Sequence, residues 1–281
     1  MAVQDNSSIA LIPSAYGTSK VYSVIPSNGN GDFTFSRSGN ATRVNKGGYI
    51  ETMGSNVARL DYPLIDGVVQ DCPALLLEPS RTNLQIRSEE FDNVAWGKSN
   101  VSITANNIVS PDGSQTADKC TVTVSGSNQA PNIFSQSGYR ASVTSGNTYI
   151  FSIFAKKGNT DFSKLRVSGS GFTSYSNDVV VNISTGQIVS GNATIDVLPN
   201  DWVRIKVSAT ANANGDGVLA IDVPDKNGNW STGSSFGGDE FIYIWGAMVE
   251  QGSYPTSYIK TSGSTVTRSA DVCNGSGTSA E

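Results

Sequence analysis

Histidine is missing from this 281-residue sequence, and that absence restricts the chemistry more than any other feature of the composition. Without an imidazole, the chain can form no Ser-His-Asp triad, no Cys-His pair and no histidine-bearing zinc site. A carboxylate-only mechanism or a Ser-Lys nucleophile would remain, but most enzyme chemistry is excluded. We therefore predict that the protein is not an enzyme and that it uses no cofactor, with the calcium ion discussed below as the one exception.

Charged residues and long apolar runs are also scarce. Asp, Glu, Lys and Arg make up 15% of the chain, the net charge is −5 and the isoelectric point is near 4.8. Lys and Arg are scattered, so the basic patch that would neutralise phosphates is missing and we predict no nucleic-acid binding. No apolar run of about 18 residues could enter a membrane, and we see no secretory signal at the N-terminus.

Cysteine is the third scarce residue type. Cys72, Cys120 and Cys273 are odd in number and far apart, and they form neither a CxxC motif nor a zinc-like spacing. We expect three reduced thiols and, together with the missing signal, synthesis in a reducing compartment.

Glycine, serine, threonine and asparagine are abundant, and they favour turns and the solvent faces of strands. Short apolar segments alternate with turn formers such as Pro111-Asp112-Gly113 and Asn227-Gly228. We predict nine strands, at residues 101–105, 118–124, 147–157, 164–169, 178–184, 186–191, 202–211, 217–224 and 241–250. With one short helical candidate at 88–96, this pattern predicts an all-β fold, an antiparallel jelly-roll sandwich preceded by an N-terminal strand and hairpin segment.

The predicted organisation has three parts. Residues 1–82 form the N-terminal strand and hairpin segment, residues 83–260 form the sandwich, and residues 261–281 form a C-terminal tail that is mobile at its extreme end.

The N-terminal segment is expected to be extended. Its apolar runs are interrupted by Pro13 and Pro26, and a hairpin is predicted from the strand at 32–37 through a turn at 45–48 to a return strand at 49–52. Because both arms are short, we expect this segment to dock on another protein or on sister copies rather than to hold a core of its own.

Aromatic residues in polar loops are candidates for binding glycans, because a sugar ring stacks its C–H face on an aromatic face. We select Trp230 in "DKNGNWSTGSSFGGDE", with Phe172 and Tyr175 in "GSGFTSYSND". The alternative is that these three side chains cap a sheet edge or contact a neighbouring subunit. The remaining tryptophans, at 96, 202 and 245, lie in strand patterns and are expected in the core.

One loop imitates the start of a calcium-binding loop. In "NANGDG", Asn212, Asn214 and Asp216 provide oxygen side chains at alternate positions. The twelfth position would be Val223, which cannot supply the bidentate carboxylate of such loops. A structural calcium ion and a plain polar turn are both open interpretations.

Two pairs of acidic residues, Glu89-Glu90 and Asp239-Glu240, are adjacent in the sequence. Neighbouring residues on a strand point to opposite faces, whereas a glycosidase needs two carboxyl groups that face each other across a cleft. This spacing argues against hydrolysis.

Several stretches resemble virion proteins of tailed bacteriophages, the head fibre, head spike and tail fibre proteins. The most specific are "LLLEPSRTNL" at 75–84 and "GSYPTSYI" at 252–259, and the likeness extends over nearly the whole chain. The central part also resembles jelly-roll carbohydrate-binding modules. The resemblance implies a structural protein of the phage surface, a head fibre or capsid decoration, made in the cytoplasm of the bacterial host. It also implies a homotrimer or homodimer, with capsid or other virion proteins as partners and glycans as candidate ligands.

The segment "LLLEPSRTNL" is predicted to be a joint between the first two parts. Pro79 ends a strand, because proline cannot donate to a ladder and restricts the residue before it. We expect Glu78 and Arg81 to pair with each other or with backbone there, in a structural role. Two alternatives to the head fibre stay open, a tail-borne receptor-binding protein and a glycan hydrolase.

Overall fold

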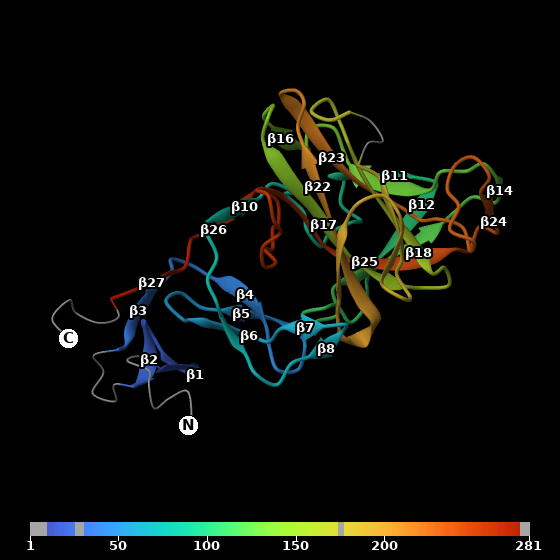
Figure 1. The fold of residues 1–281 in the computed structure, drawn as a ribbon. Helices are drawn as coiled ribbons and strands as arrows, with labels where there is room; N and C mark the ends of the chain where they lie inside the picture. The colour runs from blue at the N-terminus through green and yellow to red at the C-terminus, as the bar shows by residue number, and fades with distance from the viewer. Residues whose placement is uncertain (1–9, 26–30, 174–176, 276–281) are drawn as a thin grey trace.

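The computed structural model describes residues 10–25, 31–173 and 177–275, in which nearly all regular structure is β (Figure 1). The only helical element in these ranges is a 3-10 turn, η2 (Pro199–Asp201). The same ranges contain no helix with the length and apolar character needed to span a membrane.

Two antiparallel sheets form a jelly-roll sandwich within the described residues. The first sheet has seven strands in the order β11-β15-β23-β18-β19-β20, with β16 also paired to β23. Its strands are β11 (Trp96–Ser99), β15 (Asn132–Ser135), β16 (Ala141–Val143), β18 (Phe162–Ser168), β19 (Val179–Asn182), β20 (Gln187–Ser190) and β23 (Gly215–Asp222).

The second sheet has six strands in the order β12-β13-β25-β17-β22-β21. Its strands are β12 (Val101–Ile108), β13 (Ala117–Val122), β17 (Thr148–Lys157), β21 (Thr194–Val197), β22 (Trp202–Thr210) and β25 (Phe241–Gln251). A small ribbon of β14 (Gly126–Ser127) and β24 (Ser235–Phe236) lies beside the sandwich. All nine predicted strands are confirmed. The strands of the sandwich and its ribbon that the prediction missed have four residues or fewer, and they are β11, β14, β15, β16, β21 and β24.

The main core fills the space between the two sheets. Alternate residues of facing strands point inward, such as Phe151 and Ile153 of β17, Leu165 of β18 and Ile221 of β23, and all four are fully buried. The expectation that Trp96, Trp202 and Trp245 are core residues is confirmed, because each is at most 2% exposed.

The outer face of the six-stranded sheet is covered as well. There, Phe154 and Trp245 join a second apolar cluster, against which Ile50 and Leu64 of the N-terminal segment pack. Because β17 and β25 are buried on both faces, their sequences are almost continuously apolar. The N-terminal segment therefore docks on the sandwich of its own chain.

The N-terminal segment consists of short strands in four small sheets. Its strands are β1 (Ala10–Gly17), β2 (Lys20–Ile25), β3 (Phe33–Ser36), β4 (Ala41–Val44), β5 (Ile50–Met53), β6 (Arg59–Asp61), β7 (Leu64–Ile65), β8 (Val68–Val69) and β9 (Ala74–Leu76). The turn predicted at 45–48 is present, but it joins β4 to β5. The strand β3, which the sequence suggested as the partner, pairs with β2 and with β27 (Val272–Asn274).

Residues 261–275 are not a free tail. β26 (Val266–Arg268) pairs with β10 (Arg81–Asn83), and β27 completes the sheet of β1, β2 and β3 (Figure 1). The prediction was wrong here because the segment is polar, and its order comes from partners far away in the sequence. Residues 276–281, the extreme end, lie outside the described residues.

The helix suggested at 88–96 is also absent. These residues form turns, followed by β11 from Trp96. Asn93 accepts hydrogen bonds from the backbone of Ala95 and Trp96, through its side chain and its carbonyl, and such local bonds favour turns over a helix.

Candidate functional site

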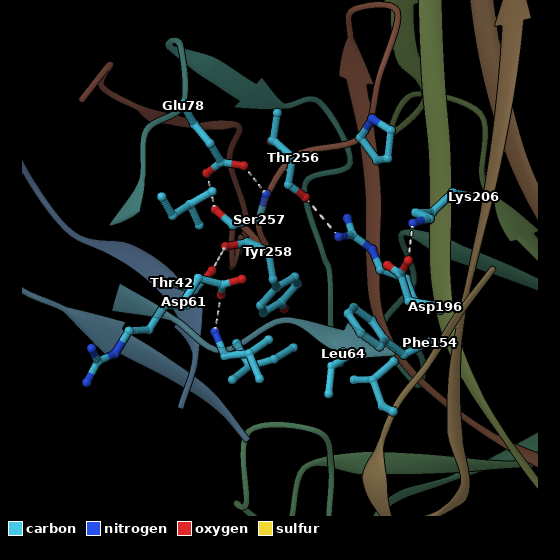
Figure 2. A pocket seen from close by; sticks show the side chains of 17 residues that line it. Thr42, Asp61, Leu64, Glu78, Phe154, Asp196, Lys206, Thr256, Ser257 and Tyr258 are labelled. Atoms are coloured by element: carbon cyan, nitrogen blue, oxygen red, sulfur yellow. Dashed lines mark hydrogen bonds and ion pairs between the residues drawn. The ribbon is translucent and has the colours of Figure 1, made fainter. Parts of the chain in front are cut away.

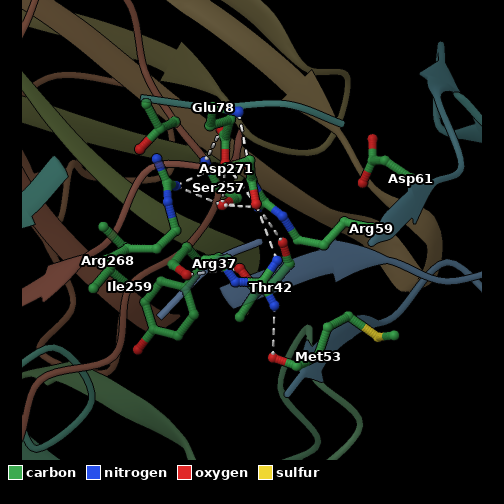
Figure 3. A network of polar contacts seen from close by, with 12 residues as sticks. Arg37, Thr42, Met53, Arg59, Asp61, Glu78, Ser257, Ile259, Arg268 and Asp271 are labelled. Carbon is green, nitrogen blue, oxygen red and sulfur yellow. Dashed lines mark hydrogen bonds and ion pairs between the residues drawn. The ribbon is translucent and has the colours of Figure 1, made fainter. Parts of the chain in front are cut away.

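A buried network of charged side chains connects the N-terminal segment, the sandwich and the C-terminal strands (Figure 3). Asp271 lies at its centre. One of its carboxylate oxygens accepts a hydrogen bond from Arg37 Nη1 at 3.0 Å, and the other contacts Arg59 Nη2. All three side chains are fully buried. Ions in such a place need partners, because an unpaired buried charge is strongly destabilising.

Glu78 is the second acidic group of the network. Its Oε2 lies 2.7 Å from Arg59 Nη1 and 2.7 Å from Arg268 Nη1, and it accepts a hydrogen bond from Ser257 Oγ at 2.6 Å. Burial by itself would raise the pKa of Glu78, but Arg268, Ser257 and Arg59 together hold that pKa below its ordinary value. Glu78 is therefore an ionised group that is bound by its neighbours. It lies at the joint, where the sequence predicted a structural role for it.

Arg81 does not take part with Glu78 as expected. Its guanidinium lies over the ring of Tyr254, 5.1 Å from the centroid, and donates to the carbonyl of Ser80 at 3.2 Å. The two residues are three positions apart in extended chain, so their side chains point to opposite sides. Pairing of the two side chains with each other is therefore wrong, and Arg59 and Arg268 pair with Glu78 instead. The alternative, pairing with backbone, is found for both residues: Arg81 donates to the carbonyl of Ser80, and Glu78 Oε1 accepts the backbone N–H of Ser257 at 2.8 Å.

The two sequence blocks singled out above meet at this joint. Besides the contacts of Ser257 with Glu78, the amide of Asn83 donates to the carbonyl of Ile259 at 2.8 Å. Asn83 Oδ1 also accepts the backbone N–H of Val249 at 3.1 Å. Residues 75–84 and 252–259 thus meet through polar contacts at Glu78 and Asn83.

A cleft of about 220 Å³ lies beside the joint, between the N-terminal segment and the six-stranded sheet (Figure 2). Thr42 and Asp61 line one side, and Asp196 and Lys206 line the other. Its groups mostly bind each other: Lys206 Nζ lies 2.5 Å from Asp196 Oδ1, and Thr42 donates to the carbonyl of Tyr258 at 2.7 Å. Burial raises the pKa of Asp61, which accepts one backbone N–H. We interpret this cleft as part of the joint.

The outer face of the seven-stranded sheet is different, because it carries polar side chains and two hollows. The larger hollow, of about 540 Å³, lies over β11, β15, β18 and β23 and includes Phe134, Arg140 and Arg166. The smaller one, of about 360 Å³, lies over β19 and β20 and includes Val180, Ser190 and residues 228–232. Both lie on one face, because the neighbours of these strand residues, such as Leu165 and Val179, point into the core.

Trp230 is the aromatic residue of the smaller hollow. Its ring is half-buried, and Lys164 Nζ, which comes up from β18, lies 2.7 Å from the ring centroid. This contact fixes the ring from one side while the ring borders open space. Trp230 therefore borders a hollow with its ring held on one side, and its role in glycan binding stays a prediction.

Phe172 does not fit the same prediction. It is 5% exposed and makes edge-on contacts with Tyr149 and Phe151, with ring centroids 6.3 and 5.4 Å away. The polar residues around it in the sequence suggested a loop, but its ring turns inward to fill the core. It cannot present a face to a sugar. Tyr175, the third predicted residue, lies outside the described residues.

The three predicted calcium ligands have protein partners. Asn214 Oδ1 accepts the N–H of Ser145 at 2.8 Å, Asn212 Nδ2 donates to Thr173 Oγ1 at 2.7 Å, and Asp216 pairs with Arg140 at 3.3 Å. In the described parts of the chain, no three Asp, Glu, Cys or His side chains gather in a way that could hold a metal. A bound calcium ion stays a prediction without support from this geometry.

The adjacent acidic pairs are largely occupied by structural contacts. Glu240 accepts hydrogen bonds from the backbone N–H groups of Gly237 and Gly238 at 2.8 and 3.1 Å, and Glu89 pairs with Lys260 at 2.7 Å.

Asp118 is a further buried carboxyl group near Glu89. Burial raises the pKa of Asp118 to about 6, although the hydrogen bonds that it accepts from the N–H groups of Asn106 and Phe91 lower this pKa.

No protein-family model matches this chain, and no curated protein matches its sequence. Solved structures resemble it over part of its length. One is the enzymatically active domain of bacteriophage CBA120 tailspike protein 4, with 13% identity over 58% of this chain and 20% of that chain, at a TM-score of 0.34. Another is the CBM22-1 xylan-binding domain of Paenibacillus barcinonensis Xyn10C, with 9% identity over 61% of this chain and 92% of that one, at a TM-score of 0.31.

A third similar structure holds the CBM22-1 and GH10 modules of Clostridium thermocellum xylanase 10B, with 18% identity over 66% of this chain and 30% of that chain, at a TM-score of 0.34. This chain thus spans less than a third of both the tailspike and the xylanase chains. Likenesses this distant do not assign a ligand, so we base the function on the geometry of the sites.

Sequence reasoning missed most of the joint. The sequence offered no reason to select four of its charged residues, because a charged residue in a polar segment is usually exposed to solvent. These four are Arg37, Arg59, Arg268 and Asp271. One signal was present at Arg59, which stands between Ala58 and Leu60, two residues that are buried in the structure. A charged residue flanked on both sides by apolar residues is a sign of a buried ion pair.

Proposed function

We propose that this chain is a non-enzymatic structural protein of a tailed-bacteriophage particle that binds glycans on the outer face of its seven-stranded sheet. The observation that carries the binding role is Trp230, whose ring is fixed by Lys164 and borders a hollow lined by polar groups. Aromatic stacking with nearby hydrogen-bonding groups suits the amphipathic surface of a sugar.

The two hollows on this face favour an extended ligand. Phe134 lies in the larger hollow and Trp230 in the smaller one, and the sheet continues between them through β18 and β19. The hollows are shallow, so we expect weak single sites that act together when many copies are present on a particle.

The role in a virion rests on the resemblance of residues 75–84 and 252–259 to phage fibre proteins. That both segments lie at one buried joint supports a common structural purpose for them. The joint fixes the N-terminal segment on the sandwich, which leaves β1 and β2 at the far end of the molecule for docking on the capsid, on other virion proteins or on sister copies (Figure 1).

Glycan binding is tested on an array of host-surface and mucus glycans with the purified chain. We expect binding that falls roughly tenfold or more, about 1.4 kcal/mol, in Trp230→Ala. Tyr139→Ala is the matched control, because Tyr139 is an exposed aromatic outside both hollows. Equal binding by the wild-type chain and Trp230→Ala would contradict the proposal. The same array with a chelator tests the predicted calcium ion.

The position on the particle is tested by electron microscopy of phage with a labelled chain. We expect label on the head. Label at the tail tip would instead assign the tail-borne receptor-binding role, for which the same sheet face would serve. Sedimentation of the purified chain tests the expected trimer or dimer.

A further inference from the structure

A lysine and a carboxylate are in contact on the outer face of the seven-stranded sheet, largely out of reach of water. Lys164 Nζ lies 2.7 Å from Asp178 Oδ2, and the two side chains are 1% and 13% exposed. In the ladder between β18 and β19, Leu165 is opposite Val179 and Lys164 is opposite Val180. Lys164 and Asp178 are therefore diagonal neighbours on adjacent strands, where long side chains reach each other.

The amine and the carboxyl group have no other close polar partners. Lys164 Nζ and both carboxylate oxygens of Asp178 are buried, and besides their contact with each other no hydrogen bond to these three atoms is found among the described residues. A nucleophilic nitrogen is therefore held in contact with a buried carboxyl group.

A second carboxyl group completes the cluster. Asp222 Oδ2 lies 3.9 Å from Lys164 Nζ, and the side chain of Asp222 is 3% exposed and bound by Arg166 at 3.0 Å. Burial raises the pKa of Asp222 and lowers the pKa of Lys164, so both groups are shifted toward their neutral forms. The ring of Trp230 covers the amine from another side.

We propose that Lys164 and Asp178 condense to form an intramolecular isopeptide bond, with Asp222 as the group that transfers protons. An amine in contact with a carboxyl group, with a second acid in reach and water excluded, is the arrangement that amide formation requires.

The reaction balances without any added reagent. Lys164 Nζ attacks Cγ of Asp178, one C–N bond forms and one C–O bond breaks. Of the three protons on the ammonium group, one stays on the amide nitrogen and two leave with the carboxylate oxygen as water. Asp222 accepts a proton from the nitrogen and returns it to the departing oxygen, so it is unchanged at the end. The positive and negative charges of the pair disappear together.

The bond would connect β18 to the start of β19 and close the chain between residues 164 and 178. A covalent link of this kind restricts the unfolded chain as a disulfide does, but it is not broken by reduction. It would also fix Lys164, the residue beneath Trp230, in place.

The test is mass spectrometry of the purified full chain. We expect an intact mass lower than the sequence mass by one water molecule. Trypsin should then fail to cut after Lys164 and yield residues 158–166 joined to residues 167–204, since no Lys or Arg lies between 166 and 204. A chain with the full mass, cleaved after Lys164, would overturn the proposal.

Variants separate the roles of the three groups. Asp178→Asn should lose one ammonia molecule instead of water, because the leaving atom is then nitrogen. Asp222→Asn and Lys164→Arg should keep their full masses, and condensation in Asp222→Asn would overturn its role. The Lys206–Asp196 pair is an internal control: its nitrogen and oxygen are also in contact, at 2.5 Å, but the side chain of Asp196 is 42% exposed to water, so cleavage after Lys206 should be normal. The bond itself is detected by the mass of the wild-type chain. That result does not depend on whether a variant folds well.

Discussion

The sandwich core and the joint are both fully buried, but opposite kinds of side chain hold them together. In the sandwich, residues such as Phe151, Leu165 and Ile221 form an apolar cluster between two sheets. At the joint, Arg37, Arg59 and Asp271 are equally buried and bind one another. Apolar packing tolerates changes of shape in small steps, whereas a buried ion depends on its specific partners.

This difference implies that the two regions fail in different ways. The core loses stability in proportion to the volume removed. The joint loses it when one partner leaves an uncompensated charge behind. Substitutions in each region test this contrast.

The largest effect is expected at Asp271. Asp271→Ala removes the carboxylate shared by two buried arginines and should lower the free energy of unfolding by about 3–5 kcal/mol. Chemical denaturation measures this. The control is Asp239→Ala, which breaks the exposed pair with Lys226 and should cost less than about 1 kcal/mol. Equal effects of the two substitutions would remove the contrast between joint and surface.

A conservative change in the sandwich core should cost less. Ile221→Val removes one methylene group from a fully buried side chain and should lower the free energy of unfolding by about 0.5–1.5 kcal/mol. The same denaturation experiment applies. A loss as large as that of Asp271→Ala would show that the core is no more tolerant than the joint.

The joint should also weaken in acid. Because its partners hold the pKa of Glu78 below the ordinary value of 4.5, the folded state binds fewer protons there than the unfolded state. The stabilisation is present above pH 4.5 and is lost as the pH falls through the lowered pKa, by up to about 1.4 kcal/mol per pH unit. Thermal unfolding between pH 3 and 7 measures it, and Glu78→Gln should show a flatter dependence. An unchanged slope in that variant would contradict the assignment.

Asp118 of the sandwich should change the stability with pH in the opposite direction. Its pKa is raised to about 6, so the folded state keeps a proton that the unfolded state releases near 3.8. The free energy of unfolding should therefore decrease as the pH rises from 3.8 to about 6. A carboxyl resonance of Asp118 with a midpoint near 6 in an NMR titration would confirm the shift, and a midpoint near 3.8 would contradict it.

The sequence predicted the sandwich well and the candidate sites only in part. Alternating apolar residues located nine strands, because the period of a strand is visible within a few residues. Phe172 was misassigned, since its polar neighbours concealed a ring that packs on Phe151. The C-terminal residues were misassigned because β26 and β27 have partners near the other end of the chain.

The sequence by itself determined the class of fold, the positions of its strands and the absence of imidazole chemistry. These properties depend on composition and on the spacing of near neighbours. Only the tertiary structure decided which charged residues become partners. Arg37 pairs with Asp271, and Lys164 pairs with Asp178. Glu78 pairs with Arg59 and Arg268 and not with Arg81. Coulomb attraction and contact act through space, so which charges become partners depends on how distant segments are brought together by folding.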